Sequence, residues 1–244
     1  LPVFLSGLIE DISQNTTVRF RLLGSAVTSI LLIIFNGSFV SNIDMPIIQD
    51  FFSNIYFSSA FTIIGYIAII NAFNFIDGVN GLSSGLGLVS IGTLSYYAFS
   101  YGNFDLSYFS LVFLLALGPF WIVNITTGKM FLGDSGSYLV GIFIGWLGVE
   151  LVFRENTFSP WYVFFIILYP AIELIFSVIR RLINQQSPFK PDDMHLHSLF
   201  YFFLAKKLGN INKLIINSVT GIIIIIFGSL PSLYMILFHN KVST

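Results

Sequence analysis

The chain has 244 residues, of which 55% are hydrophobic and 9% are charged, and its formal net charge is −1. Soluble domains carry about a quarter charged residues, so this composition indicates an integral membrane protein and gives no basis for a nucleic-acid partner. Cysteine is absent, which excludes disulfides and thiolate metal sites. A bound metal would therefore need oxygen or imidazole ligands.

Apolar segments of membrane-spanning length follow one another along the chain. A spanning helix needs roughly 20 apolar residues, and about seven segments approach this length. We expect these spans at Leu22–Val40, Ile55–Phe75, Leu82–Tyr101, Leu106–Ile125, Ser137–Phe153, Trp161–Ile183 and Leu214–Phe238. The predicted fold is all-α: a polytopic transmembrane helix bundle that forms one membrane domain over residues 1–244.

Prolines and the start of the chain add detail to this prediction. Pro170 and Pro231 fall inside expected spans, and each should kink its helix because proline removes a backbone hydrogen bond. Leu1–Ile9 has the composition of the end of an earlier span, and the chain begins with neither methionine nor the basic stretch of a signal peptide. We therefore expect a fragment that lacks upstream spans.

The basic residues are distributed unequally between the two faces of the expected bundle. Alternating the loops places only Arg154 and Lys241 of the 11 basic residues on one face. The other face receives Arg19, Arg21, Lys129, Arg180, Arg181, Lys190, Lys206, Lys207 and Lys213. Because basic loops stay in the cytoplasm, we expect this second face to be cytoplasmic and the protein to lie in the inner (cell) membrane.

The acidic residues of the expected cytoplasmic face fall in four short segments. These are GLIEDIS, NFIDGVNGLSSG, KMFLGDSGSYLVG and SPFKPDDMHLHSLF. Their acids are Glu10, Asp11, Asp77, Asp134, Asp192 and Asp193. The segments lie at the ends of expected helices, so a bundle can bring all four together around one cleft.

Asp77 and Asp134 occur in similar surroundings. Each follows an apolar helix end and precedes a helix start rich in glycine and serine. Free N–H groups at a helix start favour phosphate, and glycine allows close approach. A carboxylate there would repel phosphate unless a divalent cation lay between them, so the pair indicates a phosphate or pyrophosphate bridged by Mg²⁺. The alternative is structural: the aspartates cap helices and the glycines serve helix packing.

Other polar residues are ambiguous on their own. Glu10 and Asp11 form an acidic pair that suits a cation, a general base or simply solvent. His195 and His197 would share one side of an extended segment but not of a helix, and phosphate binding, metal binding and an interfacial position are all open. Arg181, at a helix end, either sets topology or contacts an anionic group.

Two acids, Glu150 and Glu173, lie inside expected spans. An ionisable residue within the membrane is a candidate functional residue by default. Glu173 lies about two helical turns from Arg180 and the expected cytoplasmic face. Its alternative role is to pair with a neighbouring helix.

Together the segments carry a family resemblance. NAFNFIDGVNGL, GKMFLGDSGS and RRLINQQSPFKPDDMHLHSL, in this order at membrane helix ends, resemble the polyprenyl-phosphate N-acetylhexosamine-1-phosphate transferases. These form the MraY/WecA superfamily, or glycosyltransferase family 4. GLIEDISQNTTVRFRL resembles the upstream acidic segment of the same family, and the HLH end is closer to the WecA-like branch. The resemblance covers essentially the whole chain.

The resemblance implies a helical membrane fold of about eleven spans. It implies transfer of a sugar 1-phosphate from a UDP-sugar to a polyprenyl (undecaprenyl) phosphate, with release of UMP, at the cytoplasmic face. The reaction would depend on Mg²⁺, with Mn²⁺ as an alternative, and would initiate a cell-envelope glycan such as lipopolysaccharide. The expected partners are these two substrates and the lipid bilayer, with a homodimer as a further option.

Residue roles also follow from the motif match. Asp134 and Asp77 would hold the metal, and Asp11 or Asp77 would accept a proton from the acceptor phosphate. Glu10 and Asp11 stand at the family's acidic pair. The other expected substrate contacts are Asn74, Asn80, Lys129, Arg181, His195, His197 and Ser198.

Four positions depart from the family pattern. Glu10 and Asn80 stand where the family commonly has aspartate, Asp193 takes a position that is more often basic, and Ser198 replaces a histidine. These departures motivate one alternative, a catalytically inactive scaffold paralogue. A membrane transporter is a second alternative, because intramembrane acids and broken helices suit ion pathways. Against a transporter, the polar residues gather at one membrane face and not at the midplane.

Overall fold

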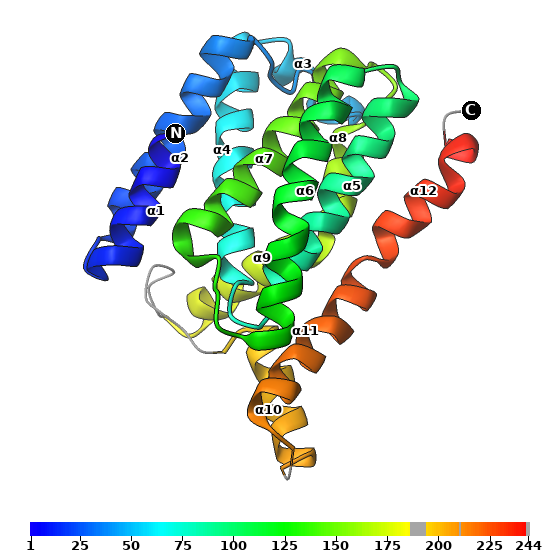
Figure 1. Ribbon diagram of the computed structural model, residues 1–244. Helices are drawn as coiled ribbons and strands as arrows, with labels where there is room; N and C mark the ends of the chain where they lie inside the picture. The colour runs from blue at the N-terminus through cyan, green and yellow to red at the C-terminus, as the bar shows by residue number, and fades with distance from the viewer. Residues whose placement is uncertain (186–193, 210, 243–244) are drawn as a thin grey trace.

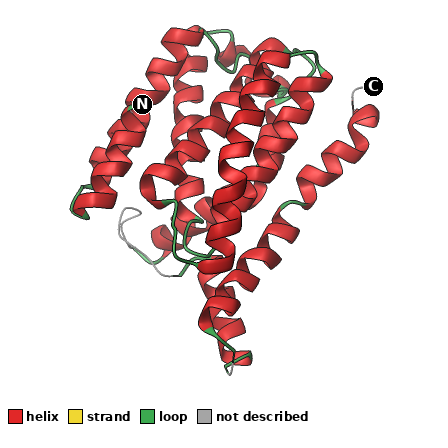
Figure 2. Cartoon of the chain, in the orientation of Figure 1, coloured by secondary structure: helices red, strands yellow, loops and turns green. Residues whose placement is uncertain are grey.

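The computed structural model describes residues 1–185, 194–209 and 211–242. Within these ranges every regular element is a helix (Figure 2). The helices are α1 (Pro2–Ser13), α2 (Val18–Asn36), α3 (Pro46–Phe52), α4 (Ile55–Phe75), α5 (Leu82–Ser100), α6 (Phe104–Thr127), α7 (Gly133–Arg154), α8 (Pro160–Ile166), α9 (Leu168–Ile183), α10 (Leu196–Lys207), α11 (Lys213–Gly228) and α12 (Leu230–Val242). The all-α prediction is confirmed. Three charged residues of the fourth segment lie outside the described residues: Lys190, Asp192 and Asp193.

The described helices form a multi-pass membrane protein. Five candidate spans are long and apolar enough to cross a bilayer, namely α2, α4, α6, α7 and α11 continued by α12, and the bent pair α8–α9 makes up to six. The third expected span, Leu82–Tyr101, forms α5, a helix of 19 residues rich in serine and glycine that is not among the candidate spans. α5 tolerates these residues because it is central: most of its side chains are buried against other helices.

Pro170 accounts for the bend between α8 and α9. The two helix axes differ by 81°. Pro170 has no N–H and cannot bond to the carbonyl group four residues earlier, which belongs to Ile166. That carbonyl instead faces the hydroxyl groups of Ser90 and Ser232, at 3.5 and 3.4 Å. The kink expected at Pro170 is therefore confirmed.

The two other prolines within spans behave differently from each other. Pro231 is the second residue of α12, directly after the break at Ser229 that separates α12 from α11. Pro119, for which no kink is predicted above, lies inside the unbroken helix α6. A proline in a membrane helix therefore marks a break at two of these three positions.

Small residues let α4 and α7 pack closely. Ser137, Gly141 and Gly145 follow one another at intervals of four on α7, the spacing that brings membrane helices together. A Cβ atom on Gly141 would lie 2.7 Å from the Cα atom of Ile70 in α4, so only glycine fits there. This contact brings Asn74, near the end of α4, beside the start of α7.

The loops that carry the expected polar segments meet at one end of the bundle. The end of α1, the α4–α5 turn, the α6–α7 loop and the start of α10 all lie toward the lower end in Figure 1. The connections α2–α3, α5–α6 and α7–α8 lie at the opposite end (Figure 1). The alternation of helices therefore gathers segments that are far apart in the sequence.

Candidate active site

Asp134, in the first turn of α7, lies at the centre of the polar cluster. Gly133 begins the helix with a φ of 65°, a left-handed conformation that glycine adopts without strain. The Asp134 carboxylate accepts hydrogen bonds from Arg21 Nη1 at 2.6 Å, from Asn74 Nδ2 at 2.8 Å and from the Tyr138 hydroxyl at 3.3 Å. Side chains from α2, α4 and α7 therefore hold this carboxylate.

Asp11 joins the end of α1 to the same helix start. Its carboxylate accepts hydrogen bonds from the backbone N–H groups of Asp134 and Ser135, at 2.8 and 3.0 Å, and from the Ser135 hydroxyl at 2.6 Å. The first N–H groups of a helix have no partner within it, and a negative charge there is favourable. A Cβ atom on Gly133 would lie 2.7 Å from Asp11 Oδ1. Asp11 thus caps α7 from another helix.

Asp77 completes a group of three carboxylates. It lies in the turn between α4 and α5, where burial raises its pKa well above the ordinary value of 3.8. The negative charges of Asp134 and Asp11 raise the pKa further, while a hydrogen bond from the Gly133 N–H opposes the shift. The three aspartates that sequence reasoning selected are therefore close enough to influence one another.

This donor set suits a hard divalent cation. Asp134 and Asp77 offer carboxylate oxygens near a third carboxyl group, and Arg21 pairs with one of the three. Among the described residues, no three Asp, Glu or His side chains are arranged to hold a metal alone. Mg²⁺ is commonly bound by one or two carboxylates together with phosphate oxygens. The residues therefore fit Mg²⁺ bound with a phosphorylated ligand.

Glu10 and Asn80 make their contacts outside this cluster. Glu10 Oε2 accepts hydrogen bonds from the N–H and hydroxyl groups of Thr16, at 2.8 and 2.6 Å. The hydroxyl bond is the main cause that lowers the pKa of Glu10. Asn80 is buried; its N–H donates to Asn217 Oδ1 at 2.6 Å, and its side chain lies 3.5 Å from Ser218 Oγ. Both residues stabilise connections between helices in this structure.

The HLH segment forms a second polar cluster against α9. The rings of His195 and His197 are stacked, with centroids 5.3 Å apart. His197 Nδ1 lies 3.0 Å from Glu173 Oε1, and His195 Nδ1 lies 3.1 Å from the Ser177 hydroxyl. The two histidines and Glu173 are buried. This cluster touches the turn that carries Asp77, because His197 packs against Gly78.

The remaining expected contacts lie around the same end of the bundle. Arg181 is buried, with its guanidinium carbon 5.7 Å from the ring centroid of Phe75. Ser198 is half-buried in the first turn of α10. Lys129 is exposed in the α6–α7 loop and forms no ion pair with any residue that the structure describes.

Three residues of the cluster escape prediction from the sequence: Arg21, Ser135 and Tyr138. From the sequence, Arg21 is interpreted only as a basic residue that sets topology. Its place at the start of an otherwise apolar helix, α2, could have indicated a functional role. Ser135 and Tyr138 follow Asp134 by one and four residues. The spacing of four puts Tyr138 on the same helix face as Asp134, which is a second usable signal.

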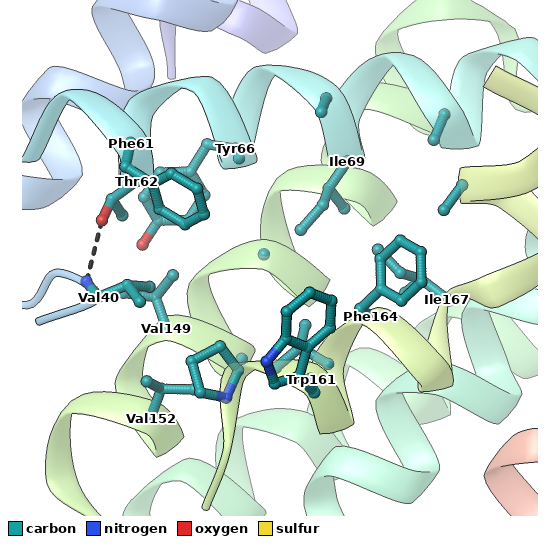
Figure 3. Close-up of a pocket in the computed structure, with 18 of the residues that line it drawn as sticks. Val40, Phe61, Thr62, Tyr66, Ile69, Val149, Val152, Trp161, Phe164 and Ile167 are labelled. Carbon is teal, nitrogen blue, oxygen red and sulfur yellow. Dashed lines mark hydrogen bonds between the residues drawn. The ribbon is translucent and has the colours of Figure 1, made fainter. Parts of the chain in front are cut away.

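An apolar groove runs along the bundle from the opposite end toward this site. It has a volume of about 280 Å³ and lies between α4, α7 and the α8–α9 bend. Figure 3 shows Tyr66 and Ile69 of α4 across from Trp161 and Phe164 of α8. The lining continues along α4 to Ala72, two residues before the asparagine that contacts Asp134.

A bundle of membrane-crossing helices with clustered carboxylates and an arginine at one end, and an apolar groove along its side, defines a polytopic membrane protein. The chain belongs to glycosyl transferase family 4, whose family model matches residues 1–152. This confirms the resemblance drawn from the motifs. The matched range contains Asp11, Asp77 and Asp134.

Curated relatives extend the similarity along the chain. An undecaprenyl-phosphate alpha-N-acetylglucosaminyl 1-phosphate transferase from Thermotoga maritima is 31% identical over 88% of this chain and 63% of its own length. A probable undecaprenyl-phosphate N-acetylglucosaminyl 1-phosphate transferase from Bacillus subtilis is 28% identical, over 85% of this chain and 58% of its own. The Escherichia coli (strain K12) relative is 28% identical, over 81% and 54% respectively. The chain thus spans less than two thirds of these relatives.

Proposed function

We propose that this chain forms part of an enzyme that transfers N-acetylhexosamine 1-phosphate from a UDP-sugar to undecaprenyl phosphate. The main observation in support is the position of the Asp134 carboxylate at the start of α7. Arg21 and Asn74 hold this carboxylate. Asp11 and Asp77 lie close to it. Such a cluster, at a helix start toward which an apolar groove leads, suits a reaction between two phosphates of which one is attached to a lipid. The reactions for which these relatives are named support the same reaction class.

In the proposed reaction an oxygen of the acceptor phosphate attacks the β-phosphorus of the donor. A new P–O bond forms there, the bond from the β-phosphorus to the bridging oxygen breaks, and UMP leaves with that oxygen. Asp134 and Asp77 would hold Mg²⁺ or Mn²⁺, which when bound would offset the negative charge of the pyrophosphate. A phosphate monoester has a second pKa near 6, so the acceptor is largely ionised at neutral pH. A carboxylate base would then mainly position it.

Two basic side chains are available to the phosphates. Arg21 Nε is buried and has no hydrogen-bond partner among the described residues. Nε is enclosed, but 23% of the Arg21 side-chain surface is exposed, so the guanidinium group would contact an anionic ligand through its exposed part while Nη1 holds Asp134. Lys129 is exposed in the adjacent loop and would reach the pyrophosphate from the aqueous side. Both charges would stabilise the negative charge that spreads during transfer.

The apolar groove would take part of the polyprenyl chain. Its lining is aliphatic and aromatic, including Ile69, Val149, Trp161 and Phe164 (Figure 3). Burial of each methylene group there is worth about 0.8 kcal/mol relative to water, although a lipid in the bilayer gains much of this already. The groove therefore mainly aligns the chain, so that its phosphate reaches the polar end.

We also propose a location and a pathway for this reaction. The distribution of basic residues supports a cytoplasmic site, in a protein of the inner membrane. The relatives' acceptor, undecaprenyl phosphate, supports a role at the first membrane step of cell-envelope glycan synthesis.

The test is release of UMP by the full-length protein in nanodiscs supplied with undecaprenyl phosphate and, in turn, several UDP-sugars. We expect release with at least one UDP-N-acetylhexosamine, and its loss after EDTA treatment. Asp134→Asn should lower the rate by about 100-fold or more, since a metal ligand supplies several kcal/mol of transition-state stabilisation.

Asp105→Asn is the matched control for this test. Asp105 also lies in the first turn of a helix and pairs with an arginine, Arg154, at 2.8 Å, but at the opposite end of the bundle. It should keep the wild-type rate. No UMP release from a folded protein with any donor would favour the scaffold alternative, and ion flux in liposomes would favour a transporter.

A further inference from the structure

Glu173 is a buried acid that the proposed reaction does not use. Its side chain in α9 is fully buried, with 0% of its surface exposed. Oε1 lies 3.0 Å from His197 Nδ1 and 3.6 Å from His195 Nδ1, whereas Oε2 has no hydrogen-bond partner among the described residues. Burying a carboxyl group is costly unless it gains a strong interaction. Among the described residues, the two histidines provide such an interaction, and the Tyr169 side chain lies close to the same carboxyl group.

The contact with Glu173 bears on where His197 carries its proton. An ionised carboxylate only accepts hydrogen bonds, so with Glu173 ionised the ring nitrogen 3.0 Å from its Oε1 donates. In that state Nδ1 of His197 carries the proton, and the orientation of the ring is set by a partner on another helix. The parallel ring of His195, inclined by only 7°, restricts His197 from its face.

The other nitrogen of His197 lies against the turn that carries Asp77. A Cβ atom on Gly78 would be 2.6 Å from His197 Nε2, closer than any side chain could approach. The imidazole thus supports the backbone of Gly78 directly. Only 2% of the His197 surface is exposed, so in this structure the ring does not face a donor in the cleft.

We propose that Glu173 is a positioning residue that acts through His197 on the Asp77–Gly78 turn. The carboxylate keeps Nδ1 of His197 protonated and the ring fixed, and the ring in turn keeps Asp77 beside Asp134. This assignment rests on the proposed function and deepens it. It gives His197 the task of supporting the turn and leaves direct donor contact to other residues.

The first test measures the histidine ring and does not depend on activity. The chain has three histidines, so ¹⁵N ring signals of the full-length protein in nanodiscs can be assigned with His195→Gln and His239→Gln. We expect Nδ1 of His197 to be protonated in the wild type. Glu173→Gln keeps an acceptor oxygen and should preserve this state. Glu173→Leu removes the acceptor, and the proton should then move to Nε2.

The second readout follows the turn itself. Glu173→Leu should shift the backbone amide signal of Gly78 and lower kcat by about 10- to 100-fold, the usual effect of losing the partner that orients a functional histidine. KM for the UDP-sugar should change far less, because neither Glu173 nor His197 contacts the donor. Glu173→Gln should restore most of kcat.

Glu150 supplies the matched control. It is also a buried glutamate within a span, bonded to the Ser38 hydroxyl at 2.6 Å, but at the opposite end of α7 from Asp134. Glu150→Leu should lower thermal stability and leave the His197 proton, the Gly78 signal and kcat unchanged.

Three results would overturn the proposal. They are an unprotonated Nδ1 of His197 in the wild type, an unchanged His197 ring in Glu173→Leu, and an equal loss of kcat in Glu150→Leu. If no donor gives UMP, the proposed function fails, but the His197 and Gly78 signals still decide whether Glu173 positions the turn.

Discussion

At the scale of single residues, the site is a balance of charges around one helix start. Asp134 and Arg21 form an ion pair of 2.6 Å in which 20% and 23% of the side-chain surfaces are exposed. Breaking a largely buried pair leaves a charge without compensation. Arg21 therefore supplies positive charge next to Asp134, where a bound divalent cation would also supply it. A bound cation and Arg21 should partly replace one another in stabilising the fold.

This equivalence can be tested with Arg21→Ala. In EDTA the substitution should lower the free energy of unfolding by about 1.5–3 kcal/mol, the contribution of a hydrogen bond to a charged group. Mg²⁺ should then stabilise the variant more than the wild type, because the cation compensates Asp134. The measurement is SDS-induced unfolding with and without Mg²⁺. Arg19→Ala, at an exposed position of α2, is the control. Equal stabilisation of both proteins by Mg²⁺ would contradict the equivalence.

Glu10 supplies a prediction about pH. The hydrogen bond from Thr16 lowers the pKa of Glu10 below its ordinary value of 4.5. A group whose pKa is lower in the folded state stabilises the fold above its unfolded pKa and loses that contribution as the pH falls through the folded pKa. The α1–α2 turn should therefore loosen below about pH 4.5. Hydrogen exchange of the Thr16 amide, which donates to Glu10, should lose protection in this range. Glu10→Gln should remove the pH dependence, and a decline that persists in that variant would assign it to another group.

At the scale of helices, the close contact between α4 and α7 sets the geometry of the site. Asn74 at the end of α4 reaches both Asp134 Oδ1 and the Ser137 hydroxyl, at 2.8 and 3.1 Å. These distances depend on how near the helix axes lie, which Gly141 determines through its contact with Ile70. A glycine within the span, about two turns from Asp134, therefore controls a hydrogen bond at the end of the helix.

Two glycine substitutions separate packing from helix propensity. Gly141→Ala would place a Cβ atom 2.7 Å from the Ile70 Cα atom, and such overpacking typically costs about 1–3 kcal/mol. Gly92→Ala in α5 would meet nothing within 4 Å and should stabilise the helix by up to about 1 kcal/mol. Thermal unfolding in detergent should therefore change in opposite directions, and only Gly141→Ala should reduce activity. A neutral Gly141→Ala would mean that α4 and α7 can separate freely.

At the scale of the whole molecule, the sequence is sufficient for the positions of the long apolar helices but not for the partners of side chains. Runs of apolar residues and the position of Pro170 predict the helices and the main break, because both effects are local. The contact of Asp11 with the backbone of Ser135 spans 124 residues and depends on how α1 packs on α7. For the same reason, interpretation of the sequence groups Glu10 and Asp11 as one acidic pair, although the two carboxylates have different hydrogen-bond partners. Asn80 is an expected substrate contact, yet its side chain contacts Ser218 of α11.

The common face on which the site depends can be tested by labelling introduced cysteines. The chain has no cysteine, so an impermeant thiol reagent gives no background. Cysteines at Gln14 and Lys129 should react only from the cytoplasmic side, whereas those at Asp50 and Asn156 should react only from outside. All four positions are exposed, so lack of reaction reports the side of the membrane and not burial. Gln186, in the same expected cytoplasmic loop as His195, lies outside the described residues. Its reactivity would show independently on which side the fourth polar segment lies. Reaction of positions 129 and 156 from one side would break the alternation that brings Asp11, Asp77 and Asp134 together.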